Sequence, residues 1–387
     1  MTALGFLALA IGHFAFCVWV INVSHSVGLD ERKMNRLALA IIATLGLASL
    51  ALLALAGFVP LDDWPIAARW YRGFCVALAT VGVPLSILLR ALQRNAEPFT
   101  KVEIDATSDL ASPLGRDRLI GNSSRAWMLR LPGNESLRIR ELSLELTVRS
   151  LPESLDGLTI LHLSDTHLST IYNPRYFEEV VARAARLGPF DLIAFTGDLI
   201  DDEEALHWVK PIFEPLRGRL GQFAILGNHD VPHRPGRVRK ALRSAGFTII
   251  DGRWNLLTLP ESRATIAIGG TSSPWGPALR AELRPSADLS IVLSHTPDLL
   301  PRKASWGVDL VLAGHNHGGQ VRLPWLGPIL MPSRYSRRYD RGVFVRGRTL
   351  MHVSAGIGGK HPIRYGCPPE IARIRLRSDR VQAGAKA

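Results

Sequence analysis

Residues 310–317 read LVLAGHNH, an apolar run that ends in Gly314, His315 and His317. Four other apolar runs also end in potential metal ligands: LHLSDTH (161–167), IAFTGDLID (193–201), AILGNHD (224–230) and IVLSHTPD (291–298). In open sheets of α/β proteins, ligands bind beyond the carboxyl ends of the strands, where loops from separate strands converge. We therefore expect the polar residues behind these five runs to share one site.

Segments with helical spacing alternate with these runs. They cover residues 176–187, 202–216 and 238–246, whereas residues 137–150 show the period-2 alternation of one or two half-buried strands. Strands that alternate with helices of this size predict an α/β (α+β) fold in which helices cover the faces of a sheet.

Each polar motif has a structural explanation when it is taken alone. Asp201 could cap a helix, because three acidic residues follow it. Asn228 could be a turn residue, and a single histidine after a strand is more often a hydrogen-bonded core residue. Together, however, the carboxylate, amide and imidazole groups form a ligand set that suits Mn, Fe or Zn better than Ca or Mg. The set as a whole predicts a metal site.

The order of the motifs resembles a known family. DTH, GDLID, GNHD, SH and GHNH match the five blocks of the calcineurin-like metallophosphoesterases, and the resemblance covers residues from about 136 to 377. SHTPD, GHNHGGQ and the ending IRYGCPPEIARIRL are similar to the membrane-associated bacterial branch.

The resemblance implies a dinuclear site at the edge of a two-sheet sandwich flanked by helices. Its implied ligands are, for the first metal, Asp165, His167 and His317, with Asp198 bridging, and for the second Asn228, His295 and His315. His229 would act as general acid or electrostatic stabiliser, and Asp201 would orient its imidazole. Two divalent transition metal ions, with Mn favoured, would share a bridging hydroxide that attacks phosphorus in line.

Three uncharged apolar runs precede this domain, at residues 1–29, 37–60 and 73–89. A membrane helix needs about 20 apolar residues, with a lower limit of about 17. We predict an all-α transmembrane region over residues 1–95 with helices at 3–24, 37–59 and 70–90. The first run could instead be a cleaved signal peptide, although it lacks a basic start, and the marginal third run could fail to span. A connector of turns and irregular chain is expected over 96–135, the metallophosphoesterase domain over 136–377 and a tail over 378–387.

Lys and Arg in short loops mark the cytoplasmic side of a membrane protein. Residues 30–36 and 90–101 each contain three of them. Three helices then place the catalytic domain in the cytoplasm of a multi-pass inner-membrane protein, whereas two would reverse this. Cys17 and Cys75 lie in apolar runs and leave Cys367 alone, which precludes a disulfide framework in the catalytic domain and fits a reducing compartment.

Residues 321–387 contain 14 Lys plus Arg against 3 Asp plus Glu, so nearly all of the net charge of +12 lies there. A basic surface on a membrane-tethered domain favours anionic headgroups or anionic substrates. Nucleic acid would also suit the charge, but no recognition motif accompanies it, and nothing in the sequence bears on oligomeric state.

The apolar stretch LPWLGPILMP (323–332) suggests a substrate. Trp325 near its centre, followed by Arg334, Arg337 and Arg338, suits an apolar loop that inserts among acyl chains beside anionic heads. This favours a phosphoester or diphosphate bond in a phospholipid or another lipid-linked substrate. Three alternatives stay open: a loop that closes over the protein's own core, a membrane-tethered phosphodiesterase for a soluble nucleotide, and a non-catalytic scaffold.

Overall fold

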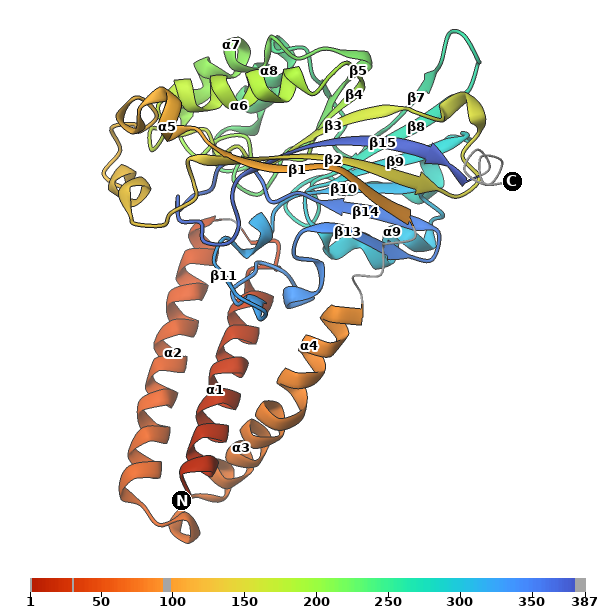
Figure 1. Ribbon diagram of the computed structural model, residues 1–387. Helices are drawn as coiled ribbons and strands as arrows, with labels where there is room; N and C mark the ends of the chain where they lie inside the picture. Colours follow the sequence, from red (N-terminus) through yellow and green to blue (C-terminus); the bar gives the residue numbers. More distant parts are fainter. Residues whose placement is uncertain (1, 30, 93–98, 380–387) are drawn as a thin grey trace.

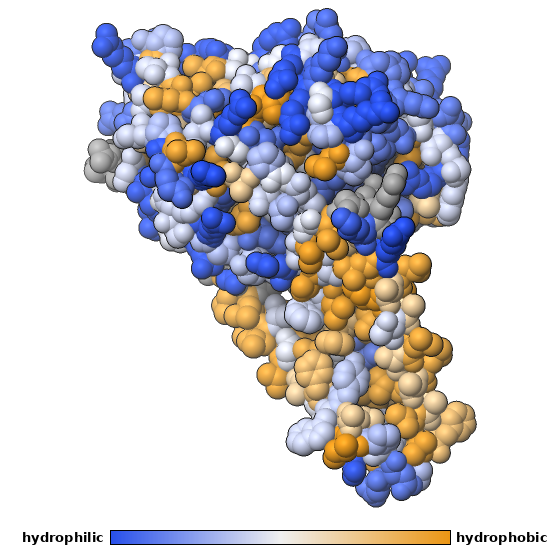
Figure 2. Space-filling view, turned by 180° about the vertical axis from the view of Figure 1, so that it is seen from behind, coloured by the Kyte–Doolittle hydropathy of each residue, from blue (hydrophilic) through white to orange (hydrophobic). Residues whose placement is uncertain are grey.

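The computed structural model describes residues 2–29, 31–92 and 99–379. Its N-terminal part is a stalk of apolar helices below a two-sheet domain (Figure 1). The stalk contains α1 (Ala3–Ser24), α2 (Glu31–Phe58) and α3 (Ile66–Ala77), which continues through a π-helical turn (Leu78–Gly82) into α4 (Val83–Leu92). Three segments, Ala3–Ser24, Arg36–Phe58 and Ile66–Leu89, are long and apolar enough to cross a membrane. Figure 2 shows the hydrophobic stalk against the more hydrophilic domain.

Pro84 explains the π-helical turn. Proline has no backbone N–H and its ring clashes with the carbonyl of the residue four positions earlier, so an apolar helix must loosen just before it. The turn at Leu78–Gly82 absorbs this mismatch, and the third helix stays continuous.

A polar cluster ties the helices together in the middle of the stalk. His13 is 8% exposed, and its ring nitrogens lie 2.7 Å from the Tyr71 hydroxyl of α3 and 2.7 Å from the Ser49 hydroxyl of α2. Gly12 lets α1 approach the backbone of Cys75 so closely that a Cβ would overlap it. Small residues and interhelical hydrogen bonds are what hold apolar helices together in lipid.

The two-sheet domain pairs a seven-stranded with a six-stranded sheet among the described residues. The first sheet has the order β1 (Thr100–Asp109), β2 (Arg138–Val148), β15 (Glu370–Ser378), β3 (Thr159–Leu163), β4 (Phe190–Phe195), β5 (Gly218–Ala224) and β6 (Thr248–Ile249). The second has the order β13 (Gly342–Arg346), β14 (Thr349–Val353), β10 (Leu310–Ala313), β9 (Leu289–Ser294), β8 (Thr265–Thr271) and β7 (Trp254–Thr258).

Alternation along the strands produces separate core layers. In β3, Ile160 faces the layer between the sheets, whereas Leu161 faces helices that cover the first sheet. These are α6 (Pro174–Arg186), α7 (Val209–Phe213) and α8 (Pro235–Ser244), and α9 (Leu300–Ser305) lies beside the second sheet. The predicted two-sheet fold with flanking helices after three apolar helices is confirmed.

The segment expected to be an irregular connector is more ordered than the sequence suggested. Residues 96–98 lie outside the described residues, but β1 pairs antiparallel with β2 over most of its length. The segment then runs through α5 (Ala111–Leu114), and Leu110, Leu119 and Leu129 are buried in the core under the first sheet. Its polar composition hid the strand because the β1 side chains are mostly exposed at the sheet edge.

Candidate metal centre

Strand ends from both sheets bring the predicted ligands to one edge of the sandwich. Asp165 and His167 follow β3, Asp198 follows β4 and Asn228 follows β5, all in the first sheet. The second sheet contributes the remaining three from the ends of β9 and β10, namely His295, His315 and His317.

Donor atoms in the first predicted ligand group lie close together. One atom each from Asp165, His167 and His317 falls within 4.8 Å of the others. The Nε2 atoms of His167 and His317 are 3.2 Å apart, and His317 Nε2 is 3.7 Å from Asp165 Oδ1. Asp198 Oδ2 lies 3.6 Å from His167 Nε2, which places this carboxylate next to the first group.

The same carboxylate also belongs to the second group. Asp198, His295 and His315 offer donor atoms within 4.8 Å of one another. His295 Nε2 lies 3.3 Å from Asp198 Oδ2 and 2.9 Å from Asn228 Oδ1. Both ring nitrogens of His315 are buried and have no partner at good hydrogen-bond geometry among the described residues, although the Pro332 backbone lies near the ring. A buried imidazole without partners is costly, and a bound cation would satisfy it, so the residues fit a metal pair.

The backbone at the site departs from ordinary conformations. Asp165, His167, Asp198, His315 and His317 all have positive φ, between 44° and 70°. Non-glycine residues rarely adopt this region, and such strain concentrates at functional sites. The sharp turns after each strand point the donor groups at a common centre.

Glycines beside the ligands allow this close approach. A Cβ on Gly227 would overlap the Asp198 carboxylate, and a Cβ on Gly314 would overlap Ser164 and the Asp165 carboxylate. The glycines in GNHD and GHNH therefore let the carboxylates pack directly against the backbone, in addition to giving the chain conformational freedom.

Asp201 links a ligand histidine to His229. Its Oδ1 atom lies 2.9 Å from His167 Nδ1 and 2.7 Å from His229 Nδ1. Asp202, and not Asp201, occupies the cap position of the following 3-10 helix, Glu203–Trp208. With its Nδ1 atom bound to Asp201, His229 is left with Nε2 to present to the cavity that it lines. The contact between Asp201 and His167 is of the kind that fixes the tautomer and orientation of a metal-binding histidine.

Burial and charge act in opposite directions on these groups. Burial disfavours the imidazolium of His229, but the carboxylates of Asp198 and Asp201 raise its pKa to about 10. A protonated His229 is suited to stabilise or protonate an oxyanion. Burial lowers the pKa of His315 and His317 well below the usual value, which keeps these imidazoles neutral as metal binding requires.

A chain of buried hydrogen bonds reaches Asp165 from the second sheet. His352 Nδ1 lies 2.8 Å from His162 Nδ1, and His162 Nε2 lies 3.0 Å from the Thr196 hydroxyl. Thr196 donates to the Ser164 hydroxyl at 2.6 Å, and Ser164 donates to Asp165. Sequence reasoning missed this chain because its members lie in or just after three strands, β3, β4 and β14, and the sequence does not show how these strands are placed relative to one another.

Asp230, the last residue of GNHD, holds two ligand loops in place. It is fully buried and accepts from the backbone N–H of Gly227 at 2.8 Å and of Leu199 at 2.8 Å. One carboxylate thus joins the loops that present Asn228 and Asp198. The sequence motif alone does not indicate this role.

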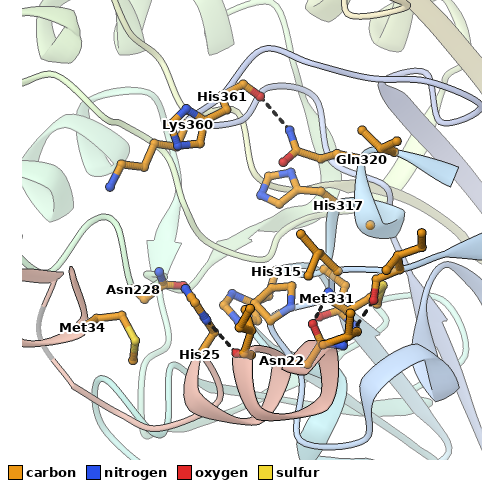
Figure 3. Close-up of a pocket in the computed structure, with 18 of the residues that line it drawn as sticks. Asn22, His25, Met34, Asn228, His315, His317, Gln320, Met331, Lys360 and His361 are labelled. Carbon is orange, nitrogen blue, oxygen red and sulfur yellow. Dashed lines mark hydrogen bonds between the residues drawn. The ribbon is translucent and has the colours of Figure 1, made fainter. Parts of the chain in front are cut away.

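A cavity of about 990 Å³ extends from the ligands to the stalk. Its polar wall includes Asn228, His229, His315 and His317, and its far wall is formed by α1, the loop after it, and Met34 of α2. Figure 3 shows Asn22 and His25 at the end of α1 together with His315 in the cavity lining. Lys360 and His361, which sequence reasoning also missed, line another side.

Trp325 and the predicted arginines lie outside this cavity lining. Trp325 is 98% exposed at the tip of a small hairpin of β11 (Arg322–Leu323) and β12 (Gly327–Pro328), so its side chain does not cover the core. Arg337 donates to the Leu326 carbonyl and to Ser86 of α4. Arg334 is exposed, and the Arg338 guanidinium lies over the Tyr339 ring.

Comparison with known proteins agrees with the motif order. A family model described as calcineurin-like phosphoesterase matches residues 158–319, a range that includes all seven predicted ligands. The chain is 34% identical over 244 residues to the uncharacterized metallophosphoesterase YkuE of Bacillus subtilis, covering 60% of this chain and 85% of the relative. It is 29% identical over 225 residues to the phosphodiesterase YaeI of Escherichia coli (56% and 81% covered). It is 27% identical over 277 residues to the UDP-2,3-diacylglucosamine pyrophosphatase LpxG of Chlamydia muridarum (57% and 84% covered).

Proposed function

Because the chain belongs to the calcineurin-like phosphoesterases, and is therefore a hydrolase of phosphoester bonds, we propose that it cleaves a phosphodiester or diphosphate bond in a lipid-linked substrate. The observation that carries this proposal is the cavity that connects the metal ligands with the apolar stalk. A phosphoryl group at the ligands and an apolar tail beside the helices would then belong to one molecule.

The two ligand groups would each hold one divalent cation, with Asp198 between them. Asp165, His167 and His317 form one set, and Asn228, His295 and His315 complete the other. When bound, such a pair activates water and neutralises charge on the phosphoryl oxygens. The mix of carboxylate, amide and imidazole ligands favours a transition metal, and we propose manganese.

His229, held by Asp201, would donate a proton to the leaving group or stabilise its negative charge. Asp201 holds the His229 ring by Nδ1, so Nε2 can donate to an oxygen of the phosphoryl or leaving group. Because Asp201 also holds His167, the donor and the metal ligand keep a fixed relative position. This pre-organisation is how active sites stabilise a developing charge.

Two relatives support the proposed substrate class. The name of LpxG describes a diphosphate that carries acyl chains, and that of YaeI a phosphodiesterase. The helices of this chain supply an apolar surface beside the same cavity, which a soluble nucleotide would not need.

A lipid extract provides the test. Detergent-purified protein with Mn²⁺ is incubated with total bacterial lipid, and products are profiled by mass spectrometry beside an Asp198→Asn variant. We expect a phospholipid or lipid diphosphate to be consumed only by the wild type. If all lipids are unchanged while a soluble nucleotide is hydrolysed, the substrate is soluble and the lipid proposal is wrong.

We also propose that the catalytic domain faces the cytoplasm. The domain lies at the end of the stalk where α2 begins, so Lys33 and Arg36 in the first turns of α2 are on its side (Figure 1). A fluorescent protein fused to the C-terminus should be bright, whereas an active alkaline phosphatase fusion there would place the domain on the opposite side.

A further inference from the structure

One face of α1 is a wall of the cavity. Its lining positions are 14, 17, 18, 21, 22 and 25, the last just beyond the helix, and they fall at i, i+3, i+4, i+7, i+8 and i+11. This spacing defines a single stripe on a helix. We call Phe14, Cys17, Val18 and Ile21 the α1 stripe.

Most of the stripe lies away from the helix contacts of the stalk. The residues of α1 that are buried against the other helices, Leu9, Gly12 and His13, lie on a different face, and Cys17, whose Sγ lies 3.5 Å from His13 Nε2, marks the border between the two faces. Phe14 is 59% exposed, although it borders the cavity. The stripe is therefore an apolar surface that the helix bundle leaves accessible.

Polarity changes along this face towards the metal ligands. The stripe is apolar from Phe14 to Ile21, which is about 10 Å along a helix, and Asn22 and His25 follow at the end that faces His315 (Figure 3). Half of a bilayer's hydrocarbon core is about 15 Å thick. The apolar part thus covers much of one leaflet, and the polar part begins near the headgroup level.

Hydrogen bonds from Asn22 hold a second segment of the cavity wall beside α1. Asn22 is 1% exposed, accepts from the Met331 N–H at 2.7 Å and donates to the Ile329 carbonyl at 3.3 Å. These bonds fix residues 329–331, with the lining side chain of Leu330 (53% exposed), beside α1. An apolar channel wall is thereby built from chain segments about 307 positions apart.

We propose that the α1 stripe binds an acyl chain of the substrate while its phosphoryl group lies at the metal ligands. This inference rests on the proposed function and assigns the first membrane helix to substrate binding. An acyl chain fits because the stripe is apolar, extends for about 10 Å along α1 and is continuous with the phosphoryl site. Burying the methylene groups of the acyl chain also removes apolar surface from water. Activity should depend on tail length, and bulk added to the stripe should reduce that dependence.

Two diesters with the same scissile bond test the inference. In both methyl and hexadecyl p-nitrophenyl phosphate, water attacks phosphorus, p-nitrophenolate leaves and an alkyl phosphate remains. Only the hexadecyl ester has a long apolar tail. With Mn²⁺ in detergent micelles, we expect the wild-type kcat/KM ratio of hexadecyl to methyl ester to be about tenfold or more. Val18→Trp should bring this ratio close to one.

The matched control is Leu47→Trp on α2. Leu47 is 69% exposed and does not line the cavity, so the same indole is added to the stalk without filling the α1 stripe. Its ratio should equal that of the wild type, which also controls for partition of the tail into micelles. A Val18→Trp protein that keeps the wild-type ratio, or a wild type without tail preference, overturns the acyl-chain site.

A labelling experiment covers the case in which Val18→Trp fails to fold. Hexadecyl phosphonate with a diazirine at the chain end is photolysed with wild-type protein, and cross-linked peptides are sequenced. Labels within residues 14–21 support the inference, and labels confined to other segments refute it. If neither ester is hydrolysed with any divalent metal, the proposed function as a phosphodiester hydrolase fails instead.

Discussion

His229 is positioned for chemistry but does not belong to either ligand group. Its Nδ1 atom is held by Asp201 and the carboxylates around it raise its pKa to about 10. We expect His229→Ala to keep both metals and lose about 10²–10³-fold in kcat, because a fixed donor near the developing charge is removed. Hydrolysis of bis(p-nitrophenyl) phosphate and elemental analysis measure this. Asp198→Asn, which should lose metal at both positions, is the control for metal content. Equal turnover of His229→Ala and wild type would contradict the role assigned to His229.

Thr196 is the central member of the hydrogen-bond chain that reaches Asp165. Its hydroxyl connects His162 to Ser164, while its backbone carbonyl accepts from His295 Nδ1 at 2.8 Å. Thr196→Val keeps the shape and the carbonyl but removes the hydroxyl. Apparent metal affinity should fall about 10–100-fold, with kcat restored at saturating Mn²⁺ and affinity restored in Thr196→Ser. An unchanged metal titration curve would show that the chain does not act on Asp165.

At the scale of elements, the hairpin of β11 and β12, which carries Trp325 at its tip, lies beside the domain end of the stalk (Figure 1). A tryptophan that is 98% exposed contributes little to folding, so Trp325→Ser with Leu326→Ser should change the free energy of unfolding by only about 0.5 kcal/mol. The double variant should lose activity on a lipid substrate in vesicles, because tryptophan anchors segments at membrane interfaces. Hydrolysis of a soluble diester should persist. Trp127→Ser removes another exposed tryptophan outside the hairpin and should affect neither. Equal losses on lipid and soluble substrate would argue for a role within the fold.

The elements also show the limits of the sequence patterns. Strands β3, β4, β9 and β10 were predictable because they are short, mostly apolar and followed by glycine or polar residues, whereas β5 (GRLGQFA) is apolar only at its end. Strand β1 was not, since an exposed edge strand lacks an apolar signature. Which face of α1 meets the cavity was equally hidden, because the helix is apolar on every side.

At the scale of the whole molecule, the predicted metal ligands come from both sheets. Each group takes donors from loops of both: His317 completes a set with Asp165, and His295 one with Asp198. Metal should therefore stabilise the domain, by about 2.7 kcal/mol at a concentration 100-fold above Kd, or roughly 5–10 °C for a domain of this size. Thermal unfolding in detergent with EDTA, and after return of Mn²⁺, measures the shift. Asp198→Asn should show a smaller shift, and a midpoint that is independent of metal in the wild type would rule out two bound ions.

The sequence by itself determined the reaction class and predicted which residues bind metal. Metal chemistry requires particular side chains, and these stand directly behind strands, so short motifs record them. It also determined that three helices are apolar enough to span, since that depends only on local composition. Tertiary structure alone decided that Asn22 binds the backbone at residues 329–331 and that the α1 stripe faces the metal ligands. Such contacts join distant segments through generic apolar and backbone groups, which carry no pattern in the chain, so only packing can reveal them.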